Sequence, residues 1–109
     1  MDYERYVMDL QGALMLSNKD NVATSLEDVE AGTDVQVRMG KEVSTIKALE
    51  RIPFGFKIAV TDISKGLNVT KYGESIGIAS QDIKRGQLVH IHNIEGARGR
   101  GDLVKGDSK

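Results

Sequence analysis

The sequence contains no cysteine and no tryptophan, and it has a single proline. Without cysteine, the chain cannot form disulfide bonds, zinc–thiolate sites or a cysteine nucleophile. Aromatic residues make up only 5% of the chain, so its core must be built mainly from Val, Ile, Leu and Ala. These absences exclude the disulfide-rich and thiol-dependent classes of small protein.

The chain also lacks a surplus of charge of either sign. It has 15 basic and 16 acidic residues, which gives a formal net charge of −1. Nucleic acids and anionic membranes attract proteins with a basic surplus, so neither is expected as a partner. No stretch approaches the roughly 20 apolar residues of a membrane helix. The N-terminal residues do not resemble a signal peptide, and we expect a cytoplasmic protein.

The length of 109 residues fits one domain. Hydrophobic residues make up 39% and charged residues 28% of the chain, which are ordinary values for a soluble globular protein. A domain of this size has a modest core and little room for a deep pocket.

One turn pattern, Asp-[Val/Ile]-x-x-Gly-x-x-Val, occurs three times, beginning at Asp28, Asp62 and Asp82. A short apolar segment typical of a strand precedes each copy. The aspartate can cap the turn by accepting hydrogen bonds from nearby backbone N–H groups, and the glycine permits a positive φ. We therefore interpret the three aspartates as structural rather than as metal ligands. The copies are unequally spaced, which predicts one compact β domain rather than a solenoid.

Alternation of apolar and polar residues predicts further strands. Residues 33–39 alternate so that Val35, Val37 and Met39 share one face. Residues 43–49 are compatible with either a strand or a helical turn. The mostly-β fold class follows from these segments together with the repeated turn.

Residues 88–94 also alternate, as LVHIHNI. If they form one strand, Val89, Ile91 and Asn93 lie on one face and His90 and His92 on the other. Two histidines placed in this way, about 7 Å apart, could share a metal ion or contact a carboxylate. The alternative is an exposed polar face of an edge strand. For Asn93, a turn at the end of the strand is at least as good an interpretation as a ligand contact.

The order of several motifs resembles one known family. The motifs are Ile52-Pro53-x-Gly55-x-Lys57, Lys71-Tyr72-Gly73-Glu74-x-Ile76-Gly77, Gln81-Asp82-Ile83-x-x-Gly86 and His90-x-His92-Asn93. Together they resemble the N-terminal domain of the altronate and galactarate dehydratases, a group that includes the sulfolactate sulfo-lyase small subunit. The resemblance covers about residues 18–103. It implies a SAF or β-clip fold of short curled strands and long loops over residues 1–95, followed by a flexible polar tail over residues 96–109.

The resemblance also implies a function. The chain is expected to be the small subunit of a sugar-acid dehydratase, inactive alone and acting with a larger catalytic chain to eliminate water from a 2-hydroxy sugar acid. This chemistry needs a base, and a metal or an acid that assists the leaving group. The resemblance implies a divalent metal, for which iron is one candidate, shared with the large partner. Formation of homo-oligomers stays open.

Six residues are candidates for the site. The motifs suggest catalytic roles for Lys57, Lys71, Tyr72 and Glu74, and metal ligation by His90 and His92. The competing interpretation is that the charged side chains are solvated and that the tyrosine packs on a sheet. Arg98 and Arg100 in the tail could dock on the large subunit.

Three other functions compete with the dehydratase. They are a sulfolactate sulfo-lyase small subunit, a non-catalytic module that binds sugar acids, and a structural or assembly domain. Phe56 stands where family members commonly carry histidine, and this departure favours the binding module slightly.

Overall fold

The computed structural model describes residues 12–96 of the chain. These residues form short strands and no helix, which confirms the predicted mostly-β fold class. The strands are β1 (Ala13–Met15), β2 (Val22–Ser25), β3 (Asp34–Met39), β4 (Glu42–Lys47), β5 (Lys57–Ala59), β6 (Asn68–Lys71), β7 (Glu74–Ala79), β8 (Leu88–Val89) and β9 (Ile94–Glu95). Over the same residues, no helix is long and apolar enough to span a membrane. The predicted tail falls outside the described residues beyond Gly96.

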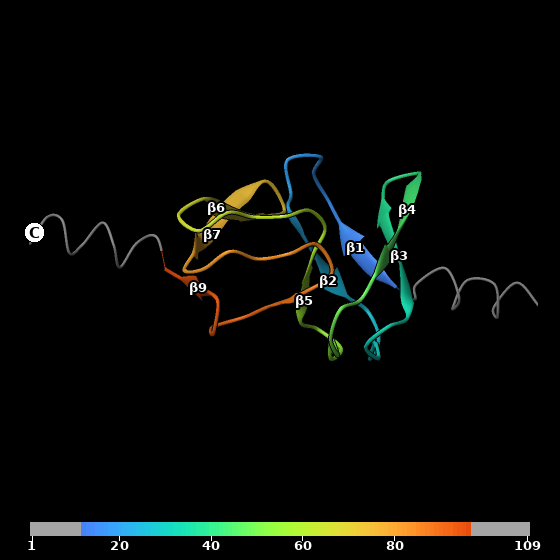
Figure 1. Ribbon diagram of the computed structural model, residues 1–109. Helices are drawn as coiled ribbons and strands as arrows, with labels where there is room; N and C mark the ends of the chain where they lie inside the picture. Colours follow the sequence, from blue (N-terminus) through green and yellow to red (C-terminus); the bar gives the residue numbers. More distant parts are fainter. Residues whose placement is uncertain (1–11, 97–109) are drawn as a thin grey trace, which may run out of the picture.

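The strands form two sheets, which lie next to each other in Figure 1. The larger sheet has six strands in the order β4-β3-β1-β2-β5-β8, and the smaller has three in the order β6-β7-β9. β1 and β3 run parallel, whereas the other neighbouring strands described are antiparallel. The larger sheet therefore places β5, and with it Lys57, between β2 and β8.

Two segments considered in the sequence analysis form neighbouring strands of the larger sheet. The strand expected over residues 33–39 is confirmed as β3, in which the Val35 and Val37 side chains are buried. The ambiguous segment 43–49 is a strand rather than a helical turn. It forms most of β4, which runs antiparallel to β3 across the turn at Gly40.

The repeated sequence pattern produces turns that associate in pairs. The turn of residues 62–66 packs against the turn of residues 82–86. Ile63 and Ile83 each donate a backbone hydrogen bond to the other's carbonyl oxygen, at 2.8 Å in both directions. Both isoleucine side chains are buried, so the paired turns also supply part of the core.

The aspartates cap these turns reciprocally. Asp62 Oδ1 accepts a hydrogen bond from the backbone N–H of Arg85, and Asp82 Oδ1 accepts one from Lys65, each at 2.8 Å. The structural role predicted for these aspartates holds. The expected bond to each aspartate's own turn is wrong, because each carboxylate reaches across to the partner turn.

The Asp28 turn pairs in the same way with a fourth turn that the pattern did not identify, residues 51–55. Val29 and Ile52 exchange backbone hydrogen bonds at 2.9 Å. Gly55 has a φ of 85°, close to the 87° of Gly32. The fold therefore contains two pairs of equivalent turns.

The fourth turn escaped the pattern because arginine occupies its first position. Asp28 Oδ1 accepts the N–H of Phe54 at 2.8 Å, as in the other pair, but Arg51 has no carboxylate to return the bond. Its guanidinium instead lies 3.9 Å from Asp28 and 3.7 Å from Glu30. These groups are exposed, so the ion pairs add little stability.

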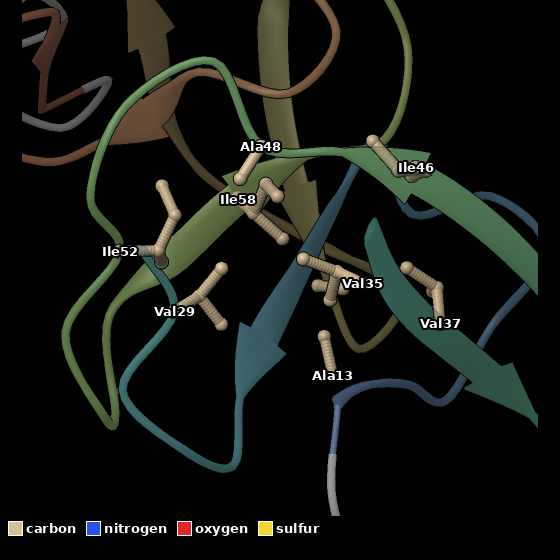
Figure 2. Packing of buried hydrophobic residues seen from close by; sticks show 9 residues of the cluster. Ala13, Val29, Val35, Val37, Ile46, Ala48, Ile52 and Ile58 are labelled. Atoms are coloured by element: carbon tan, nitrogen blue, oxygen red, sulfur yellow. The ribbon is translucent and has the colours of Figure 1, made fainter. Parts of the chain in front are cut away.

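Each pair of turns contributes side chains to one of two core clusters. The first contains Ala13, Ala23, Val29, Val35, Val37, Ile46, Ala48, Ile52 and Ile58. The side chains of this cluster that Figure 2 labels lie close to one another. The second contains Val22, Ala59, Ile63, Val69, Ala79, Ile83 and Val89. As the shortage of aromatic residues predicts, β-branched side chains and alanine fill both clusters. Each buried Val or Ile contributes roughly 1.5–3 kcal/mol.

Asn21 joins the two sheets. Its Nδ2 donates to the carbonyl oxygen of Asn68 at 2.9 Å, and its Oδ1 accepts the N–H of Thr70 at 2.7 Å. Its backbone N–H also donates to the carbonyl of Thr70. These bonds hold β6 beside β2, which brings the hairpin of β6 and β7 towards β5.

Candidate functional site

The predicted strand over residues 88–94 is wrong. β8 ends at Val89, and the chain turns before β9 begins at Ile94. The cause is Asn93, which is only 3% exposed. Its Oδ1 accepts the N–H of His90 at 2.9 Å, and its Nδ2 donates to the carbonyl oxygen of Leu88 at 2.8 Å. The amide side chain satisfies backbone groups that a continuous strand would pair with a neighbour.

The turn changes the relation between the two histidines. They do not share a strand face, and Ile91, which was expected on the face of Val89, is 80% exposed. The His90 ring packs against Phe56, with 4.6 Å between ring centroids and a tilt of 49°. His92 is exposed in the turn. The geometric reason for pairing the histidines on one metal is therefore lost.

We expect Asn93→Ala to lower the free energy of unfolding by about 2–4 kcal/mol. The change leaves the N–H of His90 and the carbonyl of Leu88 without their partner, and an unpaired buried group costs about 1–3 kcal/mol. Urea denaturation followed by circular dichroism measures the loss. Asn18→Ala is the control, because Asn18 is exposed and the change should stay within about 0.5 kcal/mol. Equal losses in both variants would contradict a structural role for Asn93.

Lys57 begins β5, where it lies opposite Thr24 of β2 and Val89 of β8. Neighbouring residues in an extended segment point to opposite faces, so Lys57 points away from the Phe56 side. The lysine is only partly exposed. Burial lowers the pKa of its amine below the ordinary value, and the positive charge of Lys71 lowers it further.

Lys71 and Tyr72 reach the same place from the β6–β7 hairpin. The Tyr72 hydroxyl donates to Thr24 Oγ1 at 3.3 Å, and Thr24 is the cross-strand neighbour of Lys57. The Lys71 ammonium lies 4.9 Å from the centre of the Tyr72 ring. The structure thus brings together three of the four predicted catalytic residues. We call Lys57, Lys71, Tyr72 and Thr24 the cationic corner.

Glu74, the fourth predicted catalytic residue, starts β7 opposite Lys71 and is exposed. It does not neutralise the corner, because neither Lys57 nor Lys71 forms an ion pair with another residue in the range 12–96. Two cationic side chains held near each other without a counter-ion are a natural binding place for an anion. A carboxylate is one such anion, and the Tyr72 hydroxyl becomes a further donor if its single proton turns from Thr24 to the anion.

The described residues do not support a complete metal site. Between residues 12 and 96, no three His, Asp or Glu side chains are grouped so that they could hold an ion. His90 contacts an aromatic ring, and His92 extends from a turn. Metal ligation by His90 and His92 therefore stays a prediction, and it requires further ligands from outside this part of the chain.

Comparison with known proteins places the chain in a family. Residues 11–97 match the family model of the altronate/galactarate dehydratase SAF domain. Because the match covers most of the chain, the protein belongs to this family.

Three curated proteins are similar to this chain. The chain is 46% identical over 74 residues to an altronate dehydratase of Escherichia coli, covering 68% of this chain and 14% of that protein. It is 33% identical over 86 residues to an altronate dehydratase of Bacillus subtilis, covering 79% and 16%. It is also 33% identical over 75 residues to the (2R)-sulfolactate sulfo-lyase subunit alpha of Chromohalobacter salexigens, covering 67% and 80%. The chain thus spans less than a fifth of either altronate dehydratase.

Proposed function

We propose that this chain supplies one side of the active site of a sugar-acid dehydratase, and that a larger catalytic part completes the site. The cationic corner is the observation that carries this proposal. The small share of each altronate dehydratase that the chain spans supports a division of the active protein into a SAF domain and a larger remainder. The chain is not expected to be active alone.

The corner suits the first requirement of the reaction. Elimination of water from a 2-hydroxy acid needs removal of the proton next to a carboxylate or its equivalent, which builds negative charge on the acid group. Cationic and hydrogen-bonding groups held against that acid group stabilise the charge. Lys71 and the Tyr72 hydroxyl are suited to hold the carboxylate. Lys57, whose pKa is lowered by burial, is suited to hold it or to accept a proton.

Glu74 has a lesser part in this proposal. It lies exposed at the start of β7, where it could face a substrate or the larger part. His90 and His92 would be ligands of a metal ion, and the larger part would supply the remaining ligands. No step of the proposed chemistry depends on that metal.

The test is reconstitution. The chain is mixed with a candidate larger dehydratase chain from the same organism, with divalent iron supplied, and loss of water from altronate and galactarate is followed by product formation. We expect turnover only when both proteins are present, and co-elution of the two on gel filtration. Turnover by this chain alone would overturn the proposal. Failure of the purified complex to process any aldonate, aldarate or sulfolactate would overturn it as well.

A second candidate has its own support. The chain spans 80% of the subunit alpha of a (2R)-sulfolactate sulfo-lyase, a protein of its own size class. Under this alternative the same corner binds the carboxylate or sulfonate of sulfolactate, and the complex releases sulfite instead of water. Sulfite release measured in the reconstitution separates the two candidates. A pure binding module predicts a third result, in which the isolated chain binds a sugar acid in calorimetry and no complex forms.

A further inference from the structure

Asp20 is a buried carboxylate that connects two separate elements. It is 6% exposed and lies at the end of the loop between β1 and β2. Its Oδ2 accepts the backbone N–H groups of Leu16 and Ser17 at 3.2 and 3.3 Å, within its own loop. Its Oδ1 accepts the N–H of Gly73 at 2.8 Å, across 53 residues of sequence. The carboxylate therefore fastens the β6–β7 turn to the loop before β2.

The β6–β7 turn needs such support because of its backbone. Tyr72 and Gly73 have φ values of 55° and 83°, so both central residues are left-handed. This conformation matches the right-handed twist of a two-residue hairpin, but it favours Asn-Gly rather than Tyr-Gly. A non-glycine residue held there costs about 1–2 kcal/mol. Tyr72 is the one non-glycine residue with positive φ in residues 12–96.

The charge state of Asp20 fits this arrangement. Burial raises its pKa, but hydrogen bonds from the backbone N–H groups of Gly73, Tyr72, Leu16 and Ser17 outweigh burial and lower the pKa below the ordinary aspartate value. The group is therefore an anion at neutral pH. Successive backbone N–H groups that point at one anion form a stable concavity, and here the anion belongs to the chain itself.

We propose that Asp20 is the positioning residue of the cationic corner: it locks Tyr72 and Gly73 in their left-handed turn, so that Lys71 and Tyr72 lie against Thr24 beside Lys57. This inference rests on the proposed function, because it explains how the side chains of the substrate-binding corner are held in position. Asp20 does not reach the corner with its own side chain, since its oxygens are occupied by backbone groups. It acts through the hairpin.

The test measures the corner in the full chain without substrate or partner. The pKa of the Lys57 amine is followed by nuclear magnetic resonance of its side-chain carbons in the wild type and in Asp20→Ala. Releasing the hairpin moves Lys71 away and exposes Lys57, so the pKa of Lys57 should rise towards the ordinary lysine value. Loss of a negative charge alone would move it in the opposite direction, because a nearby anion favours the protonated amine. The direction of the change therefore separates the two causes.

Asp28→Ala is the matched control. Asp28 also caps a turn that is distant in sequence, through the N–H of Phe54, but this is the turn that pairs with its own and not the β6–β7 hairpin. Its loss should lower stability and leave the pKa of Lys57 and the Tyr72 ring signals unchanged. If Asp20→Ala does not fold, Asp20→Asn decides, because its one carbonyl oxygen can keep the bonds to Leu16 and Ser17 within the loop, while the amide nitrogen in place of the other oxygen cannot accept the N–H of Gly73. An intermediate rise in the pKa is then expected.

The proposal is overturned if a folded Asp20 variant leaves the pKa of Lys57 unchanged or lowers it. It is also overturned if Asp28→Ala causes the same rise. Neither result depends on catalysis. A failed reconstitution would contradict the proposed function and would not affect the positioning role of Asp20. An unchanged pKa of Lys57 would contradict the positioning role and would not affect the proposed function.

Discussion

Replacing Gly86 by alanine should lower the free energy of unfolding by about 3–5 kcal/mol, a large part of the total for a small domain. Gly86 has a φ of 95°, in the region that side chains with a Cβ avoid. An added Cβ would also collide with the backbone carbonyl oxygen of Lys47. Backbone strain costs about 1–3 kcal/mol and overpacking a similar amount. The collision involves backbone atoms, so no side-chain rotation can relieve it.

The equivalent glycine of the partner turn provides the control. Gly66 has a φ of 92°, but a Cβ there would meet nothing within 4 Å. Gly66→Ala should therefore cost only the backbone strain, about 1–3 kcal/mol. The two glycines differ because the turn at Gly86 lies against Lys47 and Leu49. The carbonyl oxygen of Gly86 accepts a hydrogen bond from the N–H of Leu49 at 2.8 Å. Urea denaturation of both variants checks this, and equal losses would show that the contact at Gly86 does not matter.

The turns of this fold were predictable, but their pairing was not. The local pattern of Asp, then Val or Ile, then Gly predicts a positive φ at the glycine and a buried side chain after the aspartate. Both features are present in the turns that begin at Asp62 and Asp82. The reciprocal capping joins residues that are about 20 positions apart in sequence. No local pattern carries such information. The sequence predicts a tight connection at residues 51–55, but the repeated pattern does not include it, because Arg51 stands where the other turns have aspartate.

The site shows the same division between local and distant information. Lys57, Lys71 and Tyr72 were predicted from family motifs, and the fold brings them together. The error at residues 88–94 came from alternation that fits a strand, whereas the buried amide of Asn93 stops the strand after β8. Asp20 was missed although it follows a polar loop, because its partner Gly73 lies far along the chain. The sequence does not show which distant backbone N–H group a carboxylate will bind.

Lys57→Met should act in opposite directions on activity and on stability. In the reconstituted enzyme we expect kcat/KM to fall about 10–100-fold, because a hydrogen bond to a charged group contributes about 1.5–3 kcal/mol. In the chain alone we expect the free energy of unfolding to rise at neutral pH. Methionine keeps most of the volume of the side chain and removes a partly buried charge that is repelled by Lys71. Functional residues often reduce stability in this way.

The pH dependence of the stability gain has a definite sign. The pKa of Lys57 is lower in the folded chain than its ordinary value of 10.5, so the unfolded state binds the proton more tightly. The lysine therefore destabilises the fold fully at pH values below its folded pKa, and the penalty is relieved as the pH rises through the folded pKa towards 10.5. The advantage of Lys57→Met should be present at pH 7 and should fade in alkaline solution.

Thermal and urea unfolding at pH 7 and near pH 10.5 measure this effect, with Lys41→Met as the control. Lys41 is exposed in the β3–β4 turn, so the same chemical change there should alter neither stability nor activity by a comparable amount. A methionine at position 57 that stabilises the chain but leaves kcat/KM intact would mean that the strained lysine serves something other than the proposed reaction. A methionine that destabilises the chain at pH 7 would mean that the charge of Lys57 is neutralised in the protein, and the corner would then no longer be a place for an added anion.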